Sequence, residues 1–224
     1  MKKIVCGLLL AMGSLLSNAH ADTNYQVEII VFARDAADSE ESLRSSSDLR
    51  YPSKTVTLSA GEGSAPFQLM PPNNLLLNRE AGALEQHRGT RVLLHQAWLW
   101  PGEDAAHATA VAISAGRQFG IHREVEGYIT LSAERFLQIN TQLWLSRFGS
   151  GAANPANTLA LPTPPATNSG AANTDQRAAA ADNYTIEQLF LLREQRRMRS
   201  GELHYFDHSR FGLLVLVTPL AAAP

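Results

Sequence analysis

Apolar and polar residues alternate over most of this chain, which is the period-two pattern of β-strands. The pattern predicts strands at residues 24–34 and 90–100, and a hairpin over 124–145 that turns near Ala133 and Glu134. The segment FGLLVLVTP, residues 211–219, is apolar at nearly every position. Because a strand that is covered on both faces shows such a continuous apolar run, we expect 211–219 to be a central strand.

One helix is predicted, over residues 74–88. Asn74 occupies the N-cap position and Gly89 follows the last residue, although Gly82 inside the segment disfavours a helix. The segment 185–198 fits two interpretations, because its first half has a helical apolar stripe and its Arg-rich second half suits an edge strand; we interpret it as a strand. The predicted fold class is therefore α+β, a mainly antiparallel sheet with one or two packed helices and a long flexible insertion.

The predicted insertion covers residues 149–182, which consist mainly of Ala, Asn, Thr, Pro and Gly. With few large apolar side chains, this segment cannot bury enough surface to offset the entropy of ordering it. Two shorter breaks are expected at 35–47 and 102–120. The chain shows no internal repeat, so we expect a single domain over 22–224 that the insertion interrupts.

The first 21 residues have the features of a cleaved signal peptide. Two lysines precede an apolar run from Ile4 to Leu16, and Ala19-His20-Ala21 has the small-x-small pattern of a cleavage site. The run is shorter than the roughly 18 apolar residues that a membrane-spanning helix needs. We therefore expect an exported, periplasmic protein that has no membrane span after cleavage.

Charge and cysteine content narrow the function classes further. The formal net charge of -2 argues against a nucleic-acid-binding protein, which normally carries a basic excess. The only cysteine, Cys6, lies in the expected signal segment, so the mature chain would have neither a disulfide nor a catalytic thiolate. No serine stands in a G-x-S-x-G motif, and no pattern calls for a cofactor.

Ionisable groups are densest in RRMRSGELHYFDH, residues 196–208. His204 and His208 would share a metal only on a helix; on the strand that the aromatic pair favours they are roughly 13 Å apart. Glu202 and Asp207 are an odd number of residues apart, so a strand directs them to opposite faces rather than pairing them as acid and base. The sequence thus favours neither a metal site nor an enzyme.

Two interpretations of this block remain open. In the first, its charges pair with one another and with Glu187 and Glu194 across strands. In the second, planar guanidinium groups bind the carboxylates of a ligand. The candidate ligand-binding residues of this block are Arg196, Arg197, Arg199, Glu202, His204, Tyr205, Asp207 and His208.

The predicted hairpin offers a second candidate surface. Its polar face carries hydroxyls, amides and aromatic rings that would suit a glycan, from which we select Tyr128, Gln138 and Trp144 as ligand-binding residues. The alternative is an ordinary solvated face with Trp144 packed against a neighbouring loop. Trp98 is expected in the core, and His95 is expected to be a core histidine bonded to a backbone group. The remaining residues of the polar face are Glu126, Thr130, Ser132, Asn140 and Gln142.

The string RRMRSGELHYFDHSRFGLLVLVTP resembles the CsiV family of periplasmic peptidoglycan-binding proteins, as do LLHQAW and YQVEIIVFAR upstream. The chain departs from the family pattern at Ser209, where proline is usual, and at Trp100, where a polar residue is usual. The resemblance implies binding to peptidoglycan, no catalysis and a supporting role in regulating cell-wall synthesis. It also implies an outer-membrane lipoprotein activator of a penicillin-binding protein as a partner.

Peptidoglycan is also the abundant periplasmic polymer whose peptide stems carry carboxylates, so it suits the second interpretation of the arginines. We therefore predict a non-enzymatic peptidoglycan-binding protein. The alternative is an envelope protein-interaction module with only indirect wall association, and a wall hydrolase is the third class.

Overall fold

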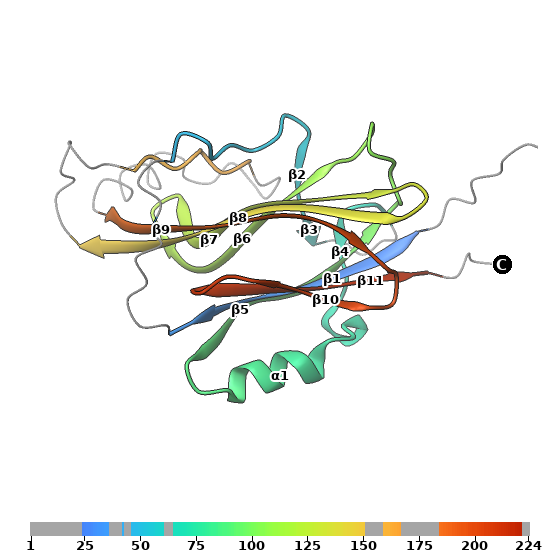
Figure 1. Cartoon of the computed structure of the whole chain (residues 1–224), viewed down its shortest axis with the longest axis horizontal. Coiled ribbons are helices and arrows are strands. Elements are labelled where there is room, and N and C mark those ends of the chain that lie inside the picture. The colour runs from blue at the N-terminus through green and yellow to red at the C-terminus, as the bar shows by residue number, and fades with distance from the viewer. Residues whose placement is uncertain are drawn as a thin grey trace, which may run out of the picture.

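The computed structural model describes residues 24–35, 42, 46–60, 65–150, 159–166 and 184–220. The predicted signal peptide and most of the predicted insertion lie outside these residues, so both stay predictions. Within the described part, two β-sheets stack face to face, with one helix on the outer side of one of them (Figure 1).

The first sheet has six strands in the order β10-β11-β1-β5-β4-β3. Its strands are β1 (Tyr25–Arg34), β3 (Ser59–Ala60), β4 (Gln68–Leu69), β5 (Thr90–Trp100), β10 (Leu203–Asp207) and β11 (Phe211–Pro219). β1 pairs antiparallel with both β5 and β11, and Tyr25 at its start lies opposite Pro219 at the end of β11. The apolar run at 211–219 is therefore an interior strand, as predicted.

The second sheet has five strands in the order β2-β6-β7-β8-β9. They are β2 (Thr55–Thr57), β6 (Ala110–Phe119), β7 (His122–Ala133), β8 (Leu137–Ser150) and β9 (Tyr184–Met198). The predicted hairpin is confirmed as β7 and β8, and the strand interpretation of 185–198 is confirmed as β9. A turn after β9 leads into β10, so this turn joins the two sheets.

The main core fills the space between the sheets. Alternate residues of β1 and β11 meet alternate residues of β6, β7, β8 and β9, because successive side chains of a strand point to opposite faces. Trp98 and Trp100 of β5 are both buried in this core, which confirms the expectation for Trp98. The largest fully buried side chains include Trp98, Trp100, Phe190, Phe206 and Phe211.

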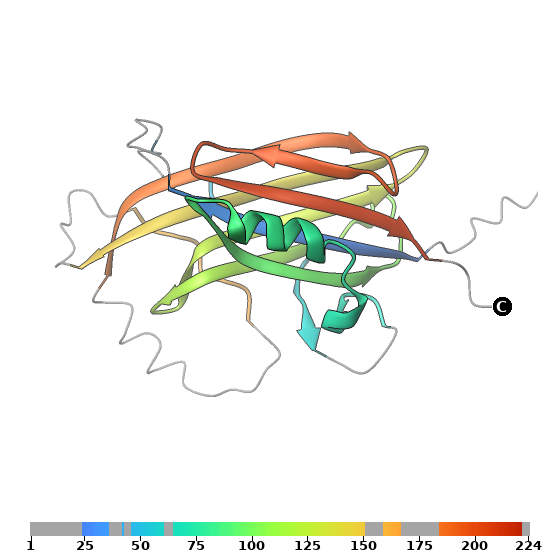
Figure 2. The same ribbon diagram turned by 90° about the horizontal axis from the view of Figure 1, so that it is seen from below.

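The helix α1 (Asn78–Gln86) packs on the outer face of the six-stranded sheet (Figure 2). It is shorter than the predicted 74–88, because residues 72–74 form a separate 3-10 turn, η1 (Pro72–Asn74). The buried carboxylate of Glu28 holds this connection, since it accepts the backbone N–H groups of Leu76 and Leu77 at 2.7 and 2.8 Å. Nε2 of His95 forms a hydrogen bond with the same carboxylate at 2.7 Å, so the prediction of a backbone partner for His95 was wrong.

Two connecting segments cover part of the outer face of the five-stranded sheet, above it in Figure 1. Leu49 and Tyr51 come from the first segment, and Leu159 and Leu161 come from the second. They pack over Trp144, and further apolar residues of β9 complete this small cluster. This second, outer core decides which residues of the sheet remain accessible.

The expected break at 102–120 was wrong in its second half, which forms β6. Val111, Ile113 and Ala115 alternate into the core, but small alanines and a serine between them make the apolar signal weak. The α+β class with a mainly antiparallel arrangement is confirmed, although the strands form two sheets instead of one.

Candidate ligand-binding site

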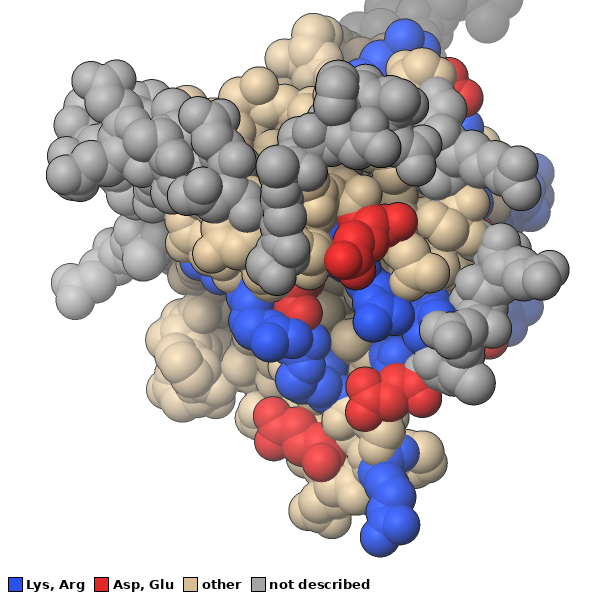
Figure 3. All heavy atoms as spheres, turned by 90° about the vertical axis from the view of Figure 1, so that its left-hand side faces the viewer, with Lys and Arg blue, Asp and Glu red and all other residues tan. Residues whose placement is uncertain are grey.

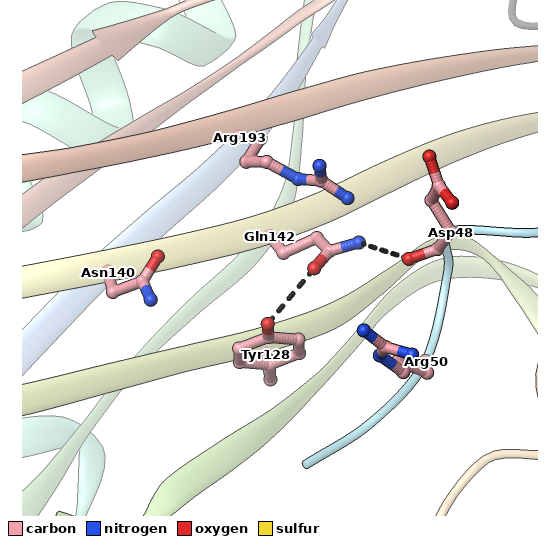
Figure 4. A pocket seen from close by; sticks show the side chains of 6 residues that line it. All are labelled: Asp48, Arg50, Tyr128, Asn140, Gln142 and Arg193. Carbon is pink, nitrogen blue, oxygen red and sulfur yellow. Dashed lines mark hydrogen bonds between the residues drawn. The ribbon is translucent and has the colours of Figure 1, made fainter.

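A polar hollow lies on the outer face of the five-stranded sheet, beside the outer core. Its volume is about 460 Å³, within the range of roughly 300 to 1,000 Å³ that small-ligand pockets have. Figure 4 shows the Tyr128 hydroxyl and the backbone carbonyl of Asp48 meeting the amide of Gln142, with the other side chains around it. The hollow is lined by Asp48, Arg50, Tyr128, Asn140, Gln142 and Arg193.

Strand register creates the floor of the hollow. Tyr128 of β7 lies opposite Gln142 of β8, and Gln142 lies opposite Arg193 of β9. Directly opposed residues of neighbouring strands point to the same face of a sheet. The three side chains therefore form a row across the sheet, and Asn140 projects from the same face two residues before Gln142 along β8.

The segment 46–51 forms the wall of the hollow. Leu49 and Tyr51 face the sheet, where the Tyr51 ring meets the indole of Trp144 edge to face with centroids 5.3 Å apart. Asp48 and Arg50 alternate with them and are exposed. Burial of Leu49 and Tyr51 thus orients the charged residues that alternate with them toward the hollow.

Hydrogen bonds fix the floor to the wall. The Tyr128 hydroxyl donates to Oε1 of Gln142 at 3.0 Å, and Nε2 of Gln142 donates to the backbone carbonyl of Asp48 at 3.2 Å. Burial, followed by the charge of nearby Glu126, raises the pKa of Tyr51, so its phenol stays neutral. The floor is consequently ordered before any ligand arrives.

Gly127 allows this arrangement because the strands approach closely beside Tyr128. Its φ of 138° lies in a region that favours glycine. A Cβ at this position would stand 2.1 Å from the backbone oxygen of Gln142. Only a residue without a side chain therefore fits next to the row.

The charged side chains of the hollow form no ion pairs within the described part of the chain. Among the described residues, no ion pair or hydrogen bond engages the carboxylate of Asp48 or the guanidinium groups of Arg50 and Arg193. Arg50 and Arg193 are both exposed. One anion and two cations thus surround a neutral, hydrogen-bonding floor.

The structure divides the arginines that the sequence grouped together. Arg196 projects from the opposite face of β9 to Arg193 and Arg197, because odd and even residues of a strand alternate. Its guanidinium contacts Glu194 at 2.6 Å, donates to the carbonyl of Tyr205 at 2.8 Å and lies over the Phe206 ring. Arg196 thus links β9 with β10 and is engaged within the protein.

The other arginines of the block lie toward the turns at one end. Arg197 covers the ring of Phe136, which is 42% exposed, at 4.1 Å from the ring centroid. Arg199 and Glu202 form an exposed pair with 3.4 Å between charged atoms, and such pairs contribute at most about 1 kcal/mol. The ring of His204 accepts the backbone N–H of Arg199, and both lie away from the hollow.

At the opposite end of the sandwich, Tyr205 and Asp207 form a network with Arg34 of β1. Arg34 donates to Asp207 at 2.6 Å and to the Tyr205 hydroxyl, which itself donates to Asp207. The bond from Tyr205, and then the Arg34 charge, hold the pKa of Asp207 below its usual value despite partial desolvation. His208 packs between the Phe190 and Phe211 rings.

Basic groups also gather at this end, but acids lie among them (Figure 3). Arg91 contacts Glu124 at 2.9 Å, and Arg117 contacts the same carboxylate at 3.5 Å. Because these arginines already have anionic partners, the end is a weaker candidate for anion binding than the hollow.

The hairpin face is confirmed only in part as an open surface. Trp144 is fully buried, so the alternative in which it packs against a loop applies. Tyr128 lines the hollow, whereas Gln138 lies on the same face two residues before Asn140 and outside the lining. Gln138 lies opposite Arg197, so these two residues extend the polar surface from the hollow along the sheet.

Two other kinds of feature are absent from the described part of the chain. It contains no group of three or more His, Cys, Asp or Glu side chains placed to hold a metal ion. It also contains no helix that is long and apolar enough to cross a membrane.

Sequence reasoning missed Asp48, Arg50 and Arg193 as site residues. Arg193 was within the predicted strand 185–198, but its neighbours on β8 follow only from the register of that strand with 137–150. Asp48 and Arg50 stand in a short polar segment whose only signal was the alternation of Leu49 and Tyr51 with charged residues.

A two-sheet sandwich with a polar, charged hollow on one outer face offers a surface that could bind a polar ligand. A family model described as peptidoglycan-binding protein, CsiV, matches residues 4–220. The chain therefore belongs to the CsiV family, which confirms the resemblance found in the sequence. Comparisons with curated proteins and with solved structures found no significant match.

Proposed function

We propose that this protein binds peptidoglycan directly and without catalysis, through the hollow on the five-stranded sheet. Family membership supports peptidoglycan as the ligand. The observation that supports this location is a pair of guanidinium groups beside a polar floor, those of Arg50 and Arg193, which form no ion pair with any described residue. Peptide stems of the wall supply carboxylates that match them.

The polar surface beyond the hollow gives the sugar chain a place to lie. Gln138 and Arg197 continue the face that carries Asn140 and Arg193. Four residues along a strand span roughly 13 Å, so the two arginines of β9 are far enough apart to meet successive parts of a polymer. In this proposal the hollow binds one charged group and the adjoining face contacts the chain that bears it.

The C-terminal block has a different role in the proposal. Arg196, Tyr205 and Asp207 support the edge of the sandwich through their internal partners. Glu202 and His204 likewise have partners within residues 196–208, and the ring of His208 accepts the backbone N–H of Arg210. Of the residues that the sequence nominated, Tyr128, Gln138 and Arg197 remain as proposed ligand contacts.

We propose a periplasmic location, because both the predicted signal segment and the proposed ligand, peptidoglycan, favour it. A supporting role in the regulation of cell-wall synthesis, through a lipoprotein activator of a penicillin-binding protein, is part of the proposal and follows from the family resemblance. The second candidate function is an interaction module that reaches the wall only through such a partner.

Co-sedimentation of the pure protein with purified sacculi tests direct binding. We expect retention of the unaltered protein and reduced retention of Arg193→Ala. Arg79→Ala is the matched control, because Arg79 is an exposed arginine on α1, across the molecule from the hollow. Absence of retention of the unaltered protein would favour the interaction module, and release of soluble fragments would reveal a hydrolase.

A further inference from the structure

The hollow combines two cations with one anion, and this combination points to a particular kind of ligand. Arg50 and Arg193 offer donors for carboxylates, and Asp48 offers an acceptor for a cation. A neutral sugar would offer none of these three groups an opposite charge. A ligand with carboxylate and ammonium groups on one residue would match each of them.

The floor is less able than the walls to discriminate between ligands. The Tyr128 hydroxyl uses its proton on Gln142, and Gln142 uses one amide proton on the wall. The amide of Asn140 takes part in no hydrogen bond among the described residues. A few neutral donors and acceptors thus remain for orientation, whereas the unpaired charges supply the stronger interactions, because hydrogen bonds to charged groups are roughly twice as strong as neutral ones.

The placement of the charges fits one amino-acid residue with its neighbours. Figure 4 shows the guanidinium groups of Arg193 and Arg50 above and below the Gln142 amide, with Asp48 to its right and Asn140 to its left. The hollow opens to solvent at the sheet surface, and its 460 Å³ is sufficient for one or two residues of a peptide. The ligand can therefore enter as the free end or side chain of a stem that is attached to a larger polymer.

We infer that the hollow binds the diamino-acid residue of an uncrosslinked peptidoglycan stem, with its carboxylates at Arg50 and Arg193 and its free ammonium at Asp48. This inference rests on the proposed function and specifies which part of the wall is bound. Crosslinking converts that ammonium into an amide and removes its charge. The protein would consequently favour wall regions whose stems have not yet been joined.

The first experiment measures binding of soluble muropeptides to the full protein by calorimetry. The probes are a disaccharide tripeptide with a free diamino-acid amine, the same compound N-acetylated at that amine, and a disaccharide without peptide. We expect the free-amine compound to bind at least tenfold more tightly than the acetylated one, and the peptide-free disaccharide to bind weakest. Equal affinity for all three would overturn the inference.

Variants of Asp48 and Arg193 test which group of the ligand each of these charged side chains binds. Asp48→Asn should abolish the preference for the free amine over the acetylated compound while carboxylate-dependent binding remains. Arg193→Ala should weaken the binding of both peptide compounds by about tenfold or more, and Arg79→Ala should leave both affinities unchanged. A preference for the free amine that persists in Asp48→Asn would contradict the assignment.

Failure of this inference is distinguishable from failure of the proposed function. If sacculi retain the protein but the free-amine muropeptide neither binds nor competes, the diamino-acid assignment is wrong and direct wall binding stands. If sacculi do not retain the protein at all, the proposed function itself is wrong.

Discussion

Replacing Trp144 tests whether the outer core holds the hollow in shape. Its indole is fully buried beneath the segment 46–51 and contacts Tyr51. A buried tryptophan removes about 150 to 250 Å² from water, which corresponds to about 4 to 6 kcal/mol at 25 cal/mol per Å². Large-to-small changes of aromatic residues cost about 3 to 5 kcal/mol, so we expect Trp144→Ala to lose about that much stability.

The same variant should impair binding beyond its effect on stability. Without the indole, Leu49 and Tyr51 lose their packing surface, and the wall that carries Asp48 and Arg50 is no longer fixed. Trp98→Ala is the matched control, because Trp98 is equally buried but belongs to the core between the sheets.

Urea unfolding gives the free energy of each variant, and sacculus retention is then measured at a temperature where both remain folded. If either protein does not fold, the milder pair Trp144→Leu and Trp98→Leu replaces them. We expect comparable losses of stability and a selective loss of retention for the Trp144 variant. Equal retention by the two folded variants would refute the role assigned to the outer core.

Three further changes have defined outcomes. Glu28→Ala leaves the buried backbone N–H of Leu77 without its acceptor, and we expect a loss of about 1 to 3 kcal/mol in urea unfolding; a loss well below about 1 kcal/mol would contradict this account. Gly127→Ala should lower the free energy of unfolding by at least about 2 kcal/mol, because it forces a residue with a side chain into a φ of 138° against the facing strand. A variant with the same free energy of unfolding as the unaltered protein would show that the strand can shift. Burial opposes ionisation of Glu124, but hydrogen bonds from Arg91 and a backbone N–H outweigh it and lower its pKa. A carboxyl whose pKa is lower in the folded state stabilises the protein above its unfolded pKa, and this contribution disappears as the pH falls through the folded value. We therefore expect Glu124→Gln to flatten the acid side of the stability profile between pH 5 and pH 2, and an unchanged profile would exclude this contribution.

The sequence predicted the long strands well because each buries at least one face. β1, β5, β7, β8 and β11 show alternating or continuous large apolar residues, and these patterns depend only on the local chain. β6 was not predicted as a strand, because alanines supply part of its buried face. The short β2, β3 and β4 carry too few residues for any periodicity to appear.

The site was harder to predict than the fold because it depends on tertiary pairing. A dense run of charges in the sequence suggested a ligand site around Arg196, yet strand alternation and the adjacent β10 edge give that residue internal partners. Arg193 stands three residues earlier in a less conspicuous context and reaches the hollow through its register with Gln142. Charge density alone therefore did not distinguish paired from unpaired guanidinium groups.

The pairing of Tyr25 with Pro219 has a mechanical consequence. The first and last described strands are adjacent and antiparallel, so both leave the sandwich at the same end (Figure 1). A force applied between Tyr25 and Pro219 would separate β1 from β11 sequentially, breaking the hydrogen bonds nearest these two residues first. The sheet that bears the hollow lies outside this line of force and would keep its shape until the other sheet had begun to separate.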